Sequence, residues 1–179
     1  MLKEDIIGNI ADIYEDYNVS EFGFCLETLC KKMEINLLPY SSYENNVILS
    51  KFDQDGFNLY NAKNGRFEIY YNDAIKPLQR IKFTIPHELG HICLGHALKT
   101  QNETHQQKRE ADLFANELYC PQAFIIYYKL FTTSDLIAAF GITEGYATIL
   151  LEKLGKRKKI TLSQNEKRLI NIFERNRRK

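Results

Sequence analysis

The sequence lacks the features that mark a membrane-spanning or exported protein. Its 179 residues contain no apolar run of about 18 residues, which excludes a transmembrane helix of ordinary length. The first residues, Met1–Ile7, are acidic and amphipathic, and they do not form the basic start and apolar core of a signal peptide. Only four cysteines are present and none forms a CxxC pair, so we expect a reduced protein of the cytoplasm.

Net positive charge is confined to the C-terminal region. Residues 156–179 carry ten Lys or Arg and two Glu, which is a net charge of +8 and leaves −7 for residues 1–155 of a chain whose total is +1. Within 165–178, the apolar residues Leu169, Ile172 and Phe173 recur on one side of a helix. We therefore expect a basic helical tail at 156–179. It either faces nucleic acid or a docking partner, or it is a solvated tail without such a role.

The stretch Thr84–His96 has the spacing of a metal site. Residues four apart share a helix face, so His87 and His91 can present their imidazoles to one point. Two imidazole nitrogens with one or two oxygen ligands suit Zn²⁺, and Glu88 lies about 100° further round, toward the position of a metal-bound water. A carboxylate there can take the water's proton as the water attacks a carbonyl. This HExxH pattern predicts a zinc-dependent peptidase with one Zn²⁺ per chain.

Two neighbouring features strengthen this interpretation, because the five-residue pattern alone also occurs by chance. Apolar residues such as Ile85 and Leu89 indicate a buried helix, in which unpaired histidine and glutamate side chains are costly. Gly90 lowers helix propensity by about 1 kcal/mol relative to Ala, which predicts that another group packs closely against the helix there.

A third metal ligand is expected in the helix that follows. Eighteen residues separate His91 from Glu110, which is enough for the polar loop 99–105 and the return of an antiparallel helix. Glu110 flanks the apolar face of that helix and is the predicted ligand. The alternative is that Glu110 only caps or solvates the helix start. Asp112 and Glu117 are the fallback acids.

The two remaining histidines are less favoured as metal ligands. His96 follows His91 by five residues, whereas a longer zincin pattern requires six, and on a continuous helix it lies opposite His87. We expect His96 at the helix C-terminus or against a ligand, unless Gly95 breaks the helix and lets His96 bind the metal. Asp112 is a further candidate for contact with a ligand or the substrate. His105 either contacts substrate or is a solvated loop residue.

The two stretches together carry a family resemblance. Phe83–His96, FTIPHELGHICLGH, and Glu110–Pro121, EADLFANELYCP, resemble the ImmA/IrrE family of metallo-endopeptidases in order and spacing. The resemblance covers about residues 20–155 and is tightest at 66–121. It implies the zinc ligands His87, His91 and Glu110, Glu88 as general acid and base, and a helix-turn-helix repressor as substrate. One departure is Pro86, where the family usually has Ala.

The hydrophobic periodicity predicts a mostly helical α+β fold. We expect helices at 1–17, 21–33 and 110–118, and a metal-site helix that begins either near Pro77 or at Pro86. A further helix starts at Pro121, and two more are expected at 134–141 and 143–154 with caps at Ser134 or Thr143. Segments 57–60 and 67–71 form a predicted hairpin through Asn64-Gly65, and 47–49 a predicted short strand. An extended substrate is expected to add a strand to this sheet and to protect the amides of 67–71.

The expected fold class is therefore α+β, a mostly helical zincin-like catalytic domain at 1–155 with a small antiparallel sheet. Its catalytic core is expected at about 66–121 and a helical support at 122–155, followed by the basic tail at 156–179.

Three functions follow from these patterns. The first is a zinc-dependent endopeptidase that cleaves a protein, a helix-turn-helix repressor of a phage or mobile element. The alternative is a metal-dependent regulatory partner that binds a repressor or toxin without cutting it. A DNA-binding regulator built on 134–179 is the weakest of the three, because the helix-turn-helix shape at 134–154 lacks exposed Arg and Lys side chains that could read bases.

Overall fold

The computed structural model describes residues 1–76, 79–96, 104–157 and 161–179. Helices account for most of these residues, and one small sheet accompanies them. The chain divides into two compact units. One unit is Cys25–Ala115, and the other combines Met1–Phe24 with Asn116–Lys179.

A three-stranded mixed sheet forms the centre of the unit Cys25–Ala115. Strands β2 (Gly56–Asn61) and β3 (Arg66–Tyr71) pair antiparallel through a turn that contains Gly65, which has φ +70°, so the predicted hairpin is confirmed. Strand β1 (Asn36–Pro39) pairs parallel with β3 on its other side, so the sheet is mixed and not antiparallel as predicted. The order β1-β3-β2 places β3 in the middle and leaves β2 at an edge.

This order corrects the expectation about where a substrate strand could add. The amides of 67–71 belong to the central strand β3, which already has a neighbour on each side. A strand can add only where backbone groups face outward, at an edge. On the hairpin side, that edge is β2.

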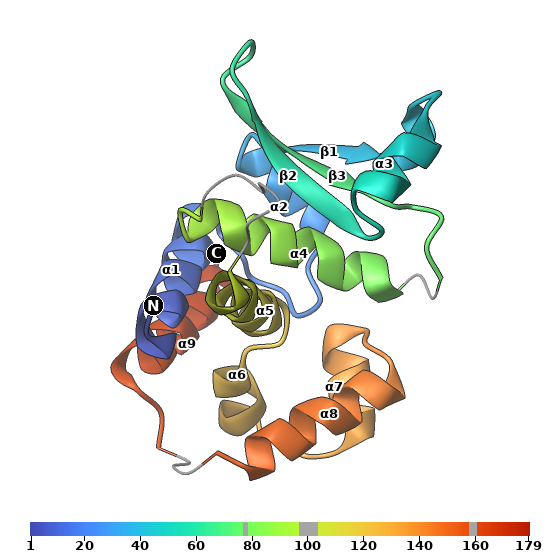
Figure 1. The fold of residues 1–179 in the computed structure, drawn as a ribbon. Coiled ribbons are helices and arrows are strands. Elements are labelled where there is room, and N and C mark those ends of the chain that lie inside the picture. Colours follow the sequence, from blue (N-terminus) through green and yellow to red (C-terminus); the bar gives the residue numbers. More distant parts are fainter. Residues whose placement is uncertain (77–78, 97–103, 158–160) are drawn as a thin grey trace. The chain divides into compact units, whose positions relative to one another are not determined.

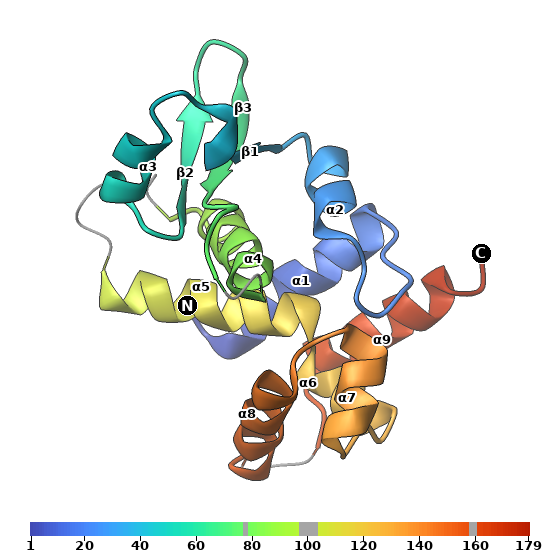
Figure 2. The ribbon, with the colours of Figure 1, turned by 90° about the vertical axis from the view of Figure 1, so that its right-hand side faces the viewer.

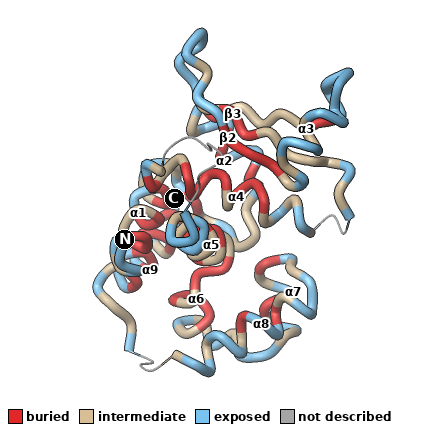
Figure 3. Tube along the Cα trace, in the orientation of Figure 1, coloured by how far each residue is buried: buried red, intermediate tan, exposed pale blue. Residues whose placement is uncertain are grey.

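Helix α4 (Gln79–Cys93) lies along one face of this sheet (Figure 1). Gly56 of β2 makes the close approach of strand and helix possible. A Cβ atom at this position would lie 2.7 Å from the Thr84 side chain and 2.6 Å from the Tyr70 carbonyl oxygen. Buried residues follow the first half of β2 and much of α4 (Figure 3).

The segment that precedes β2 differs from its prediction. Residues 47–49 belong to helix α3 (Asn46–Phe52), so the predicted short strand is wrong. A short apolar run fits a strand or a helix equally, and here no sheet neighbour decides between them because Val47 and Ile48 are 62% and 63% exposed. Figure 2 shows α3 beside β2, where Phe52 packs edge-on against Phe57. A helix α2 (Leu26–Lys32) and a 3-10 turn (Tyr40–Ser42) complete the segment before β2.

The second unit is entirely helical in its described residues. Its helices are α1 (Lys3–Asp16), α6 (Gln122–Tyr127), α7 (Thr133–Phe140), α8 (Glu144–Gly155) and α9 (Gln164–Asn176), and it also contains the last turn of α5 (His105–Tyr119). Aromatic rings fill its centre, with Phe22, Phe124 and Phe173 packed in mutual contact. The predicted helix 21–33 begins only at Leu26, because Gly23 has φ +58° and Phe22 turns into this core.

Helix α9 is part of this unit, which differs from the expected division between 1–155 and a tail at 156–179. The helix itself is confirmed, and its apolar residues Leu169, Ile172 and Phe173 are buried, chiefly against α1. Asn176 fixes its C-terminal end by donating to the carbonyl oxygens of Tyr14 and Val19. The apolar stripe that predicted a helix also requires a surface to cover it, and α1 supplies that surface.

The predicted fold class, a mostly helical α+β zincin-like fold with one small sheet, is confirmed. Among the described residues, no single helix is long and apolar enough to cross a membrane. Only α7 and α8 taken together pass such a test of length and composition, and a bend of 115° separates them.

Candidate metal centre

Helix α4 carries the HExxH residues, and a tight turn follows it. The helix contains Pro86 in its interior, where proline has no N–H to donate to the preceding turn. It ends at Cys93, and Gly95 then adopts the left-handed conformation with φ +65°. The backbone N–H of His96 donates to the His91 carbonyl oxygen at 3.0 Å. A continuous helix would place His96 on the face opposite His87. Because α4 ends at Cys93, His96 does not lie on that face.

Helix α5 approaches α4 closely at Gly90. A Cβ atom there would lie 3.1 Å from the ring of Phe114 and 3.2 Å from the Cα atom of Ala111. The expectation that another group packs closely against Gly90 is therefore confirmed. This contact brings the N-terminal half of α5, which carries Glu110 and Asp112, beside the histidines of α4.

Asp112 sets the orientation of the first histidine. Its Oδ1 lies 2.8 Å from Nδ1 of His87, whose side chain is 13% exposed. A carboxylate only accepts, so Nδ1 of His87 carries the proton and Nε2 carries the ring's lone pair. This is the tautomer that a metal requires at Nε2.

A second chain of hydrogen bonds sets the orientation of His91. Nε2 of His96 lies 3.0 Å from Oε2 of Glu110, and Nδ1 of His96 lies 2.9 Å from Nδ1 of His91. Glu110 accepts from Nε2 of His96, so Nδ1 of His96 accepts in turn from Nδ1 of His91. Nε2 of His91 then carries the lone pair as well. Glu110 also accepts from Gln106 through its other oxygen, at 2.9 Å.

The two Nε2 atoms therefore converge with their lone pairs. They lie 3.2 Å apart. Two imidazoles on one tetrahedral Zn²⁺, with Zn–N near 2.0–2.1 Å, have nitrogens about 3.3–3.4 Å apart. Facing lone pairs repel, and a cation between them relieves that repulsion. The donor chemistry of the pair fits zinc. Within the described ranges, however, no three His, Cys, Asp or Glu side chains are placed so that they could hold a metal together.

Glu88 lies on the buried side of α4, against the sheet. Glu88 is 2% exposed, and its Oε2 accepts a hydrogen bond of 2.8 Å from Nδ2 of Asn58 on β2. Asn58 is itself only 1% exposed. The sequence patterns did not single out Asn58, because its place between Phe57 and Leu59 indicates a solvent-facing position in an alternating strand. The sheet is covered on both faces at this point, so Phe57 and Asn58 are both buried.

The structure thus gathers most of the predicted site residues in one unit. His87, His91, His96, Glu110 and Asp112 form one set: hydrogen bonds join Asp112 to His87 and join Glu110 through His96 to His91, and the Nε2 atoms of His87 and His91 face each other at 3.2 Å. His105 is exposed at the first position of α5, and in the described part of the chain no hydrogen bond joins it to this set. Glu117 lies in the other unit, where Lys3 neutralises it at 2.8 Å. The predicted loop 99–105 lies mostly outside the described residues.

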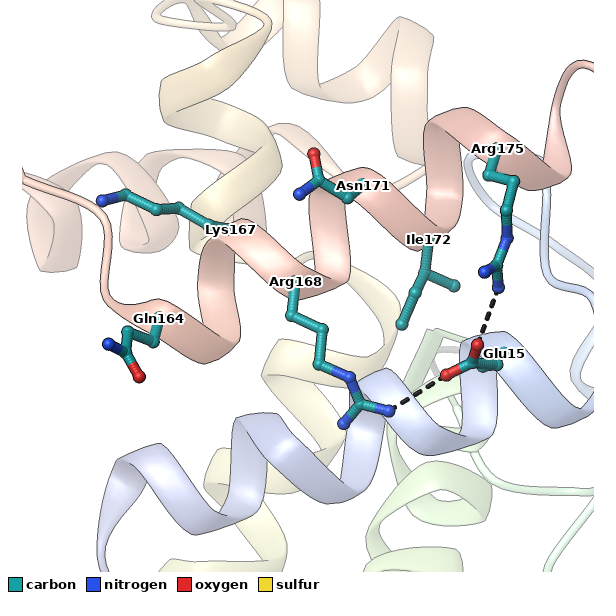
Figure 4. Close-up of a pocket in the computed structure, with 7 residues that line it drawn as sticks. All are labelled: Glu15, Gln164, Lys167, Arg168, Asn171, Ile172 and Arg175. Carbon is teal, nitrogen blue, oxygen red and sulfur yellow. Dashed lines mark hydrogen bonds and ion pairs between the residues drawn. The ribbon is translucent and has the colours of Figure 1, made fainter.

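An open groove of about 500 Å³ in the other unit offers a different kind of surface. It lies between α1 and α9, and its lining includes Lys167, Arg168 and Arg175 (Figure 4). Figure 4 shows Arg168 and Arg175 both directed at Glu15, and the ion-pair distances are 3.0 Å and 2.9 Å. We interpret the groove as an ion-pair network between the two helices, because Glu15 already neutralises part of its positive charge.

Comparison with known proteins yields one family. The sequence model described as the IrrE N-terminal-like domain, a peptidase family, matches residues 40–149. This range contains every residue of the hydrogen-bonded set and Asn58. No curated protein and no solved structure matches the chain.

Proposed function

Because the chain belongs to the peptidase family of the IrrE N-terminal-like domain, we propose that it is a zinc-dependent endopeptidase. Family membership supports a metallopeptidase-like function and implies a protein substrate. The observation that carries the zinc assignment is the convergence of the His87 and His91 Nε2 atoms at 3.2 Å, with both tautomers set by hydrogen bonds.

The proposed ligands are His87, His91 and Glu110. Glu110 is supported by its place beside the histidines, although its carboxylate hydrogen-bonds to His96 and Gln106 in this structure. Ligation by Glu110 would require it to exchange at least one of these partners for the metal. When bound, the metal would polarise a peptide carbonyl and acidify a water molecule.

The residues of the chain then have distinct tasks. Glu88 takes the proton of the attacking water and delivers it to the leaving amine. Asp112 holds His87 in the tautomer that leaves Nε2 for ligation, and His96 does the same for His91. The buried position of Glu88 keeps bulk water away from its carboxylate, so the carboxylate exchanges protons with the attacking water and not with bulk solvent.

The proposed substrate is a helix-turn-helix repressor of a phage or mobile element. The resemblance of the two metal-site stretches to the ImmA/IrrE family suggests this class. An extended segment of the substrate could pair with β2, which is an edge strand and also carries Asn58 beside Glu88. We place the reaction in the cytoplasm, where such repressors act.

A non-cleaving role is the second candidate, and one observation favours it. The described residues contain no completed group of three metal ligands. A protein that keeps two histidines and lacks the third ligand could bind a repressor or toxin without hydrolysing it.

The test is bound metal and cleavage measured together. Wild type, Glu88→Gln and His91→Ala are each co-expressed with a helix-turn-helix repressor, and purified protein is also incubated with a peptide library from a digested bacterial proteome. We expect wild type to hold about one zinc per chain and to cut. Glu88→Gln should keep the metal and lose cleavage, and His91→Ala should lose both.

Two other outcomes would contradict this result. A wild-type protein that holds metal and binds the repressor without cleaving it would favour the non-cleaving role. A wild type without metal would refute the zinc assignment.

The basic residues of α9 have no assigned role in this reaction. Contact with nucleic acid or with the repressor stays a proposal. Truncation at Gly155 would remove the buried residues Leu169, Ile172 and Phe173 and uncover the surface of α1 against which they pack, so substitution of the exposed Lys167 and Arg178 by Gln is the better test. Loss of salt-sensitive DNA binding in these variants would support the proposal, and wild type that binds no DNA would refute nucleic-acid contact.

A further inference from the structure

We propose that Asn58 is the positioning residue of Glu88, so that the general base of the metal centre is oriented by a side chain of the sheet. This inference rests on the proposed peptidase function. It starts from the hydrogen bond of 2.8 Å between Nδ2 of Asn58 and Oε2 of Glu88, which joins β2 to α4 across the interior of the unit Cys25–Ala115.

The register between strand and helix makes this contact specific. Gly56 and Asn58 are two apart on β2 and therefore project to the same face of the sheet. Thr84 and Glu88 are four apart on α4 and share one face of the helix. Gly56 meets the side chain of Thr84 and Asn58 meets that of Glu88. Two residues of strand advance by about 6.6–6.8 Å and four residues of helix by about 6.0 Å, so the two contacts stay in step.

Burial makes the contact strong enough to orient a carboxylate. Asn58 and Glu88 are 1% and 2% exposed, so neither group can exchange its partner for bulk water. An unpaired buried polar group costs about 1–3 kcal/mol, and a bond to an ionised partner is stronger than one between neutral groups. The amide of Asn58 thereby holds the side-chain torsions of Glu88 while the carboxylate handles protons.

The neighbouring phenol does not supply this function. Tyr40 is buried close enough for the charge of Glu88, after burial itself and the charge of Asp53, to contribute to raising the pKa of its hydroxyl. That hydroxyl donates to the backbone carbonyl of Asp53 at 3.1 Å. The hydrogen bond from Asn58 joins Glu88 to strand β2 of the sheet.

A matched pair of substitutions tests the proposal. Asn58→Leu removes the amide from Glu88 and keeps the branching and the number of heavy atoms of the side chain. Asn61→Leu is the control, because Asn61 lies on the same strand and donates to the Glu68 carboxylate at the same distance of 2.8 Å, remote from the HExxH residues. Steady-state cleavage is measured on the library peptide that wild type cuts fastest, together with zinc content and thermal midpoint.

We expect Asn58→Leu to lower kcat by about 10- to 100-fold, with KM and zinc content close to wild type. Asn61→Leu should stay within about twofold of wild-type kcat. Equal kcat values for Asn58→Leu and wild type would overturn the proposal while leaving the peptidase function intact. Equal losses of kcat in both variants would also overturn it, because the effect would then be a general response of the strand.

A second measurement does not depend on activity or on the folding of the Asn58 variant. In ¹H–¹⁵N spectra, the side-chain amide of Asn58 should exchange slowly with solvent in wild type. Glu88→Ala should shift one of its amide proton resonances upfield and speed its exchange. An Asn58 amide that does not respond to Glu88→Ala refutes the inference, whether or not the protein proves to be a peptidase.

Discussion

At the scale of single residues, the candidate metal centre depends on contacts that fix side chains and helices at short distances. Asp112 shows this most directly. Its side chain is 41% exposed, so burial is not the reason for its position, and its hydrogen bond of 2.8 Å to His87 gives the ring one tautomer. Partners of this kind hold a ligand ready and reduce the cost of ordering it when the metal binds.

We therefore predict that Asp112→Ala lowers zinc affinity by about 10- to 100-fold without unfolding the protein. The control is Asp55→Ala, which removes a carboxylate of the same 41% side-chain exposure from an ion pair of 2.7 Å with Arg80. Competition with a fluorescent zinc chelator measures both. Equal affinities for the two variants would show that Asp112 does not act through His87.

Gly90 illustrates a close approach between helices rather than a need for unusual torsion angles. Replacement of an interior helical Gly by Ala ordinarily stabilises by about 1 kcal/mol. At Gly90 the new methyl group would lie 3.1 Å from Phe114 and 3.2 Å from the Cα atom of Ala111, and the latter is backbone that yields little.

Gly90→Ala should therefore destabilise the unit Cys25–Ala115 by about 1–3 kcal/mol, despite the gain in helix propensity. Gly145→Ala on α8 is the matched control, since no atom of the described structure lies within 4 Å of its added Cβ, and it should be neutral or stabilising. Amide hydrogen exchange reports on each unit separately. A stabilised Gly90→Ala protein would mean that α5 moves away at little cost.

At the scale of helices and strands, the sequence predicts best where local chemistry and packing agree. Residues 133–155 show both outcomes. The predicted cap at Thr143 is confirmed, because its side chain accepts from the N–H of Tyr146. The cap of α7 is Thr132 and not Ser134, so that alternative is wrong. Asp135 is three residues after Thr132 and completes a reciprocal capping box, a spacing that the sequence already contained.

Thr132→Ala should destabilise α7 by about 0.5–2 kcal/mol, because it leaves the N–H of Asp135 without its acceptor. Ser134→Ala, inside the first turn, should change stability by less than about 0.5 kcal/mol. Chemical denaturation of the two variants and wild type provides the comparison. A larger effect of Ser134→Ala would contradict the cap assignment.

The candidate site was predictable in part, and for a physical reason. Helical spacing alone brings His87 and His91 to one point, and the turn of chain to the next helix brings Glu110 and Asp112 near them. Asn58 could not be found in this way. Its contact with Glu88 depends on how a strand and a helix are stacked, and strand alternation indicated exposure. The prediction of a strand at residues 47–49 was wrong for a similar reason, because no local rule separates a short exposed helix from a strand.

At the scale of the whole molecule, charge and burial together explain why the basic C-terminal segment forms a helix that packs into its unit. The basic residues of α9, Lys167, Arg168 and Arg175, are exposed, while buried residues attach the helix to α1. One charged pair is also enclosed. Arg157 and Glu166 form two parallel hydrogen bonds of 2.7 Å, and Glu166 is 2% exposed. This pair joins the residue that follows the C-cap of α8 to the first turn of α9.

The Arg157–Glu166 pair leads to a prediction about stability at low pH. Burial alone would raise the pKa of Glu166, but the hydrogen bonds from Arg157 and from the Ser163 backbone outweigh burial and hold that pKa below its usual value. A carboxyl whose pKa is depressed by folding stabilises the folded state above its unfolded pKa, near 4.3. That stabilisation is lost as the pH falls through the folded pKa.

Glu166→Gln should therefore lower the free energy of unfolding by about 1–3 kcal/mol at pH 7, and the difference from wild type should shrink steadily below about pH 4. Glu15→Gln is the control. Arg175 and then Arg168 also lower the pKa of Glu15, but that carboxylate is exposed and screened by salt, so stability should change little at either pH. Urea unfolding of the three proteins from pH 7 to pH 3 decides the matter. A constant gap between Glu166→Gln and wild type over that range would mean that packing, and not the charged pair, accounts for the loss.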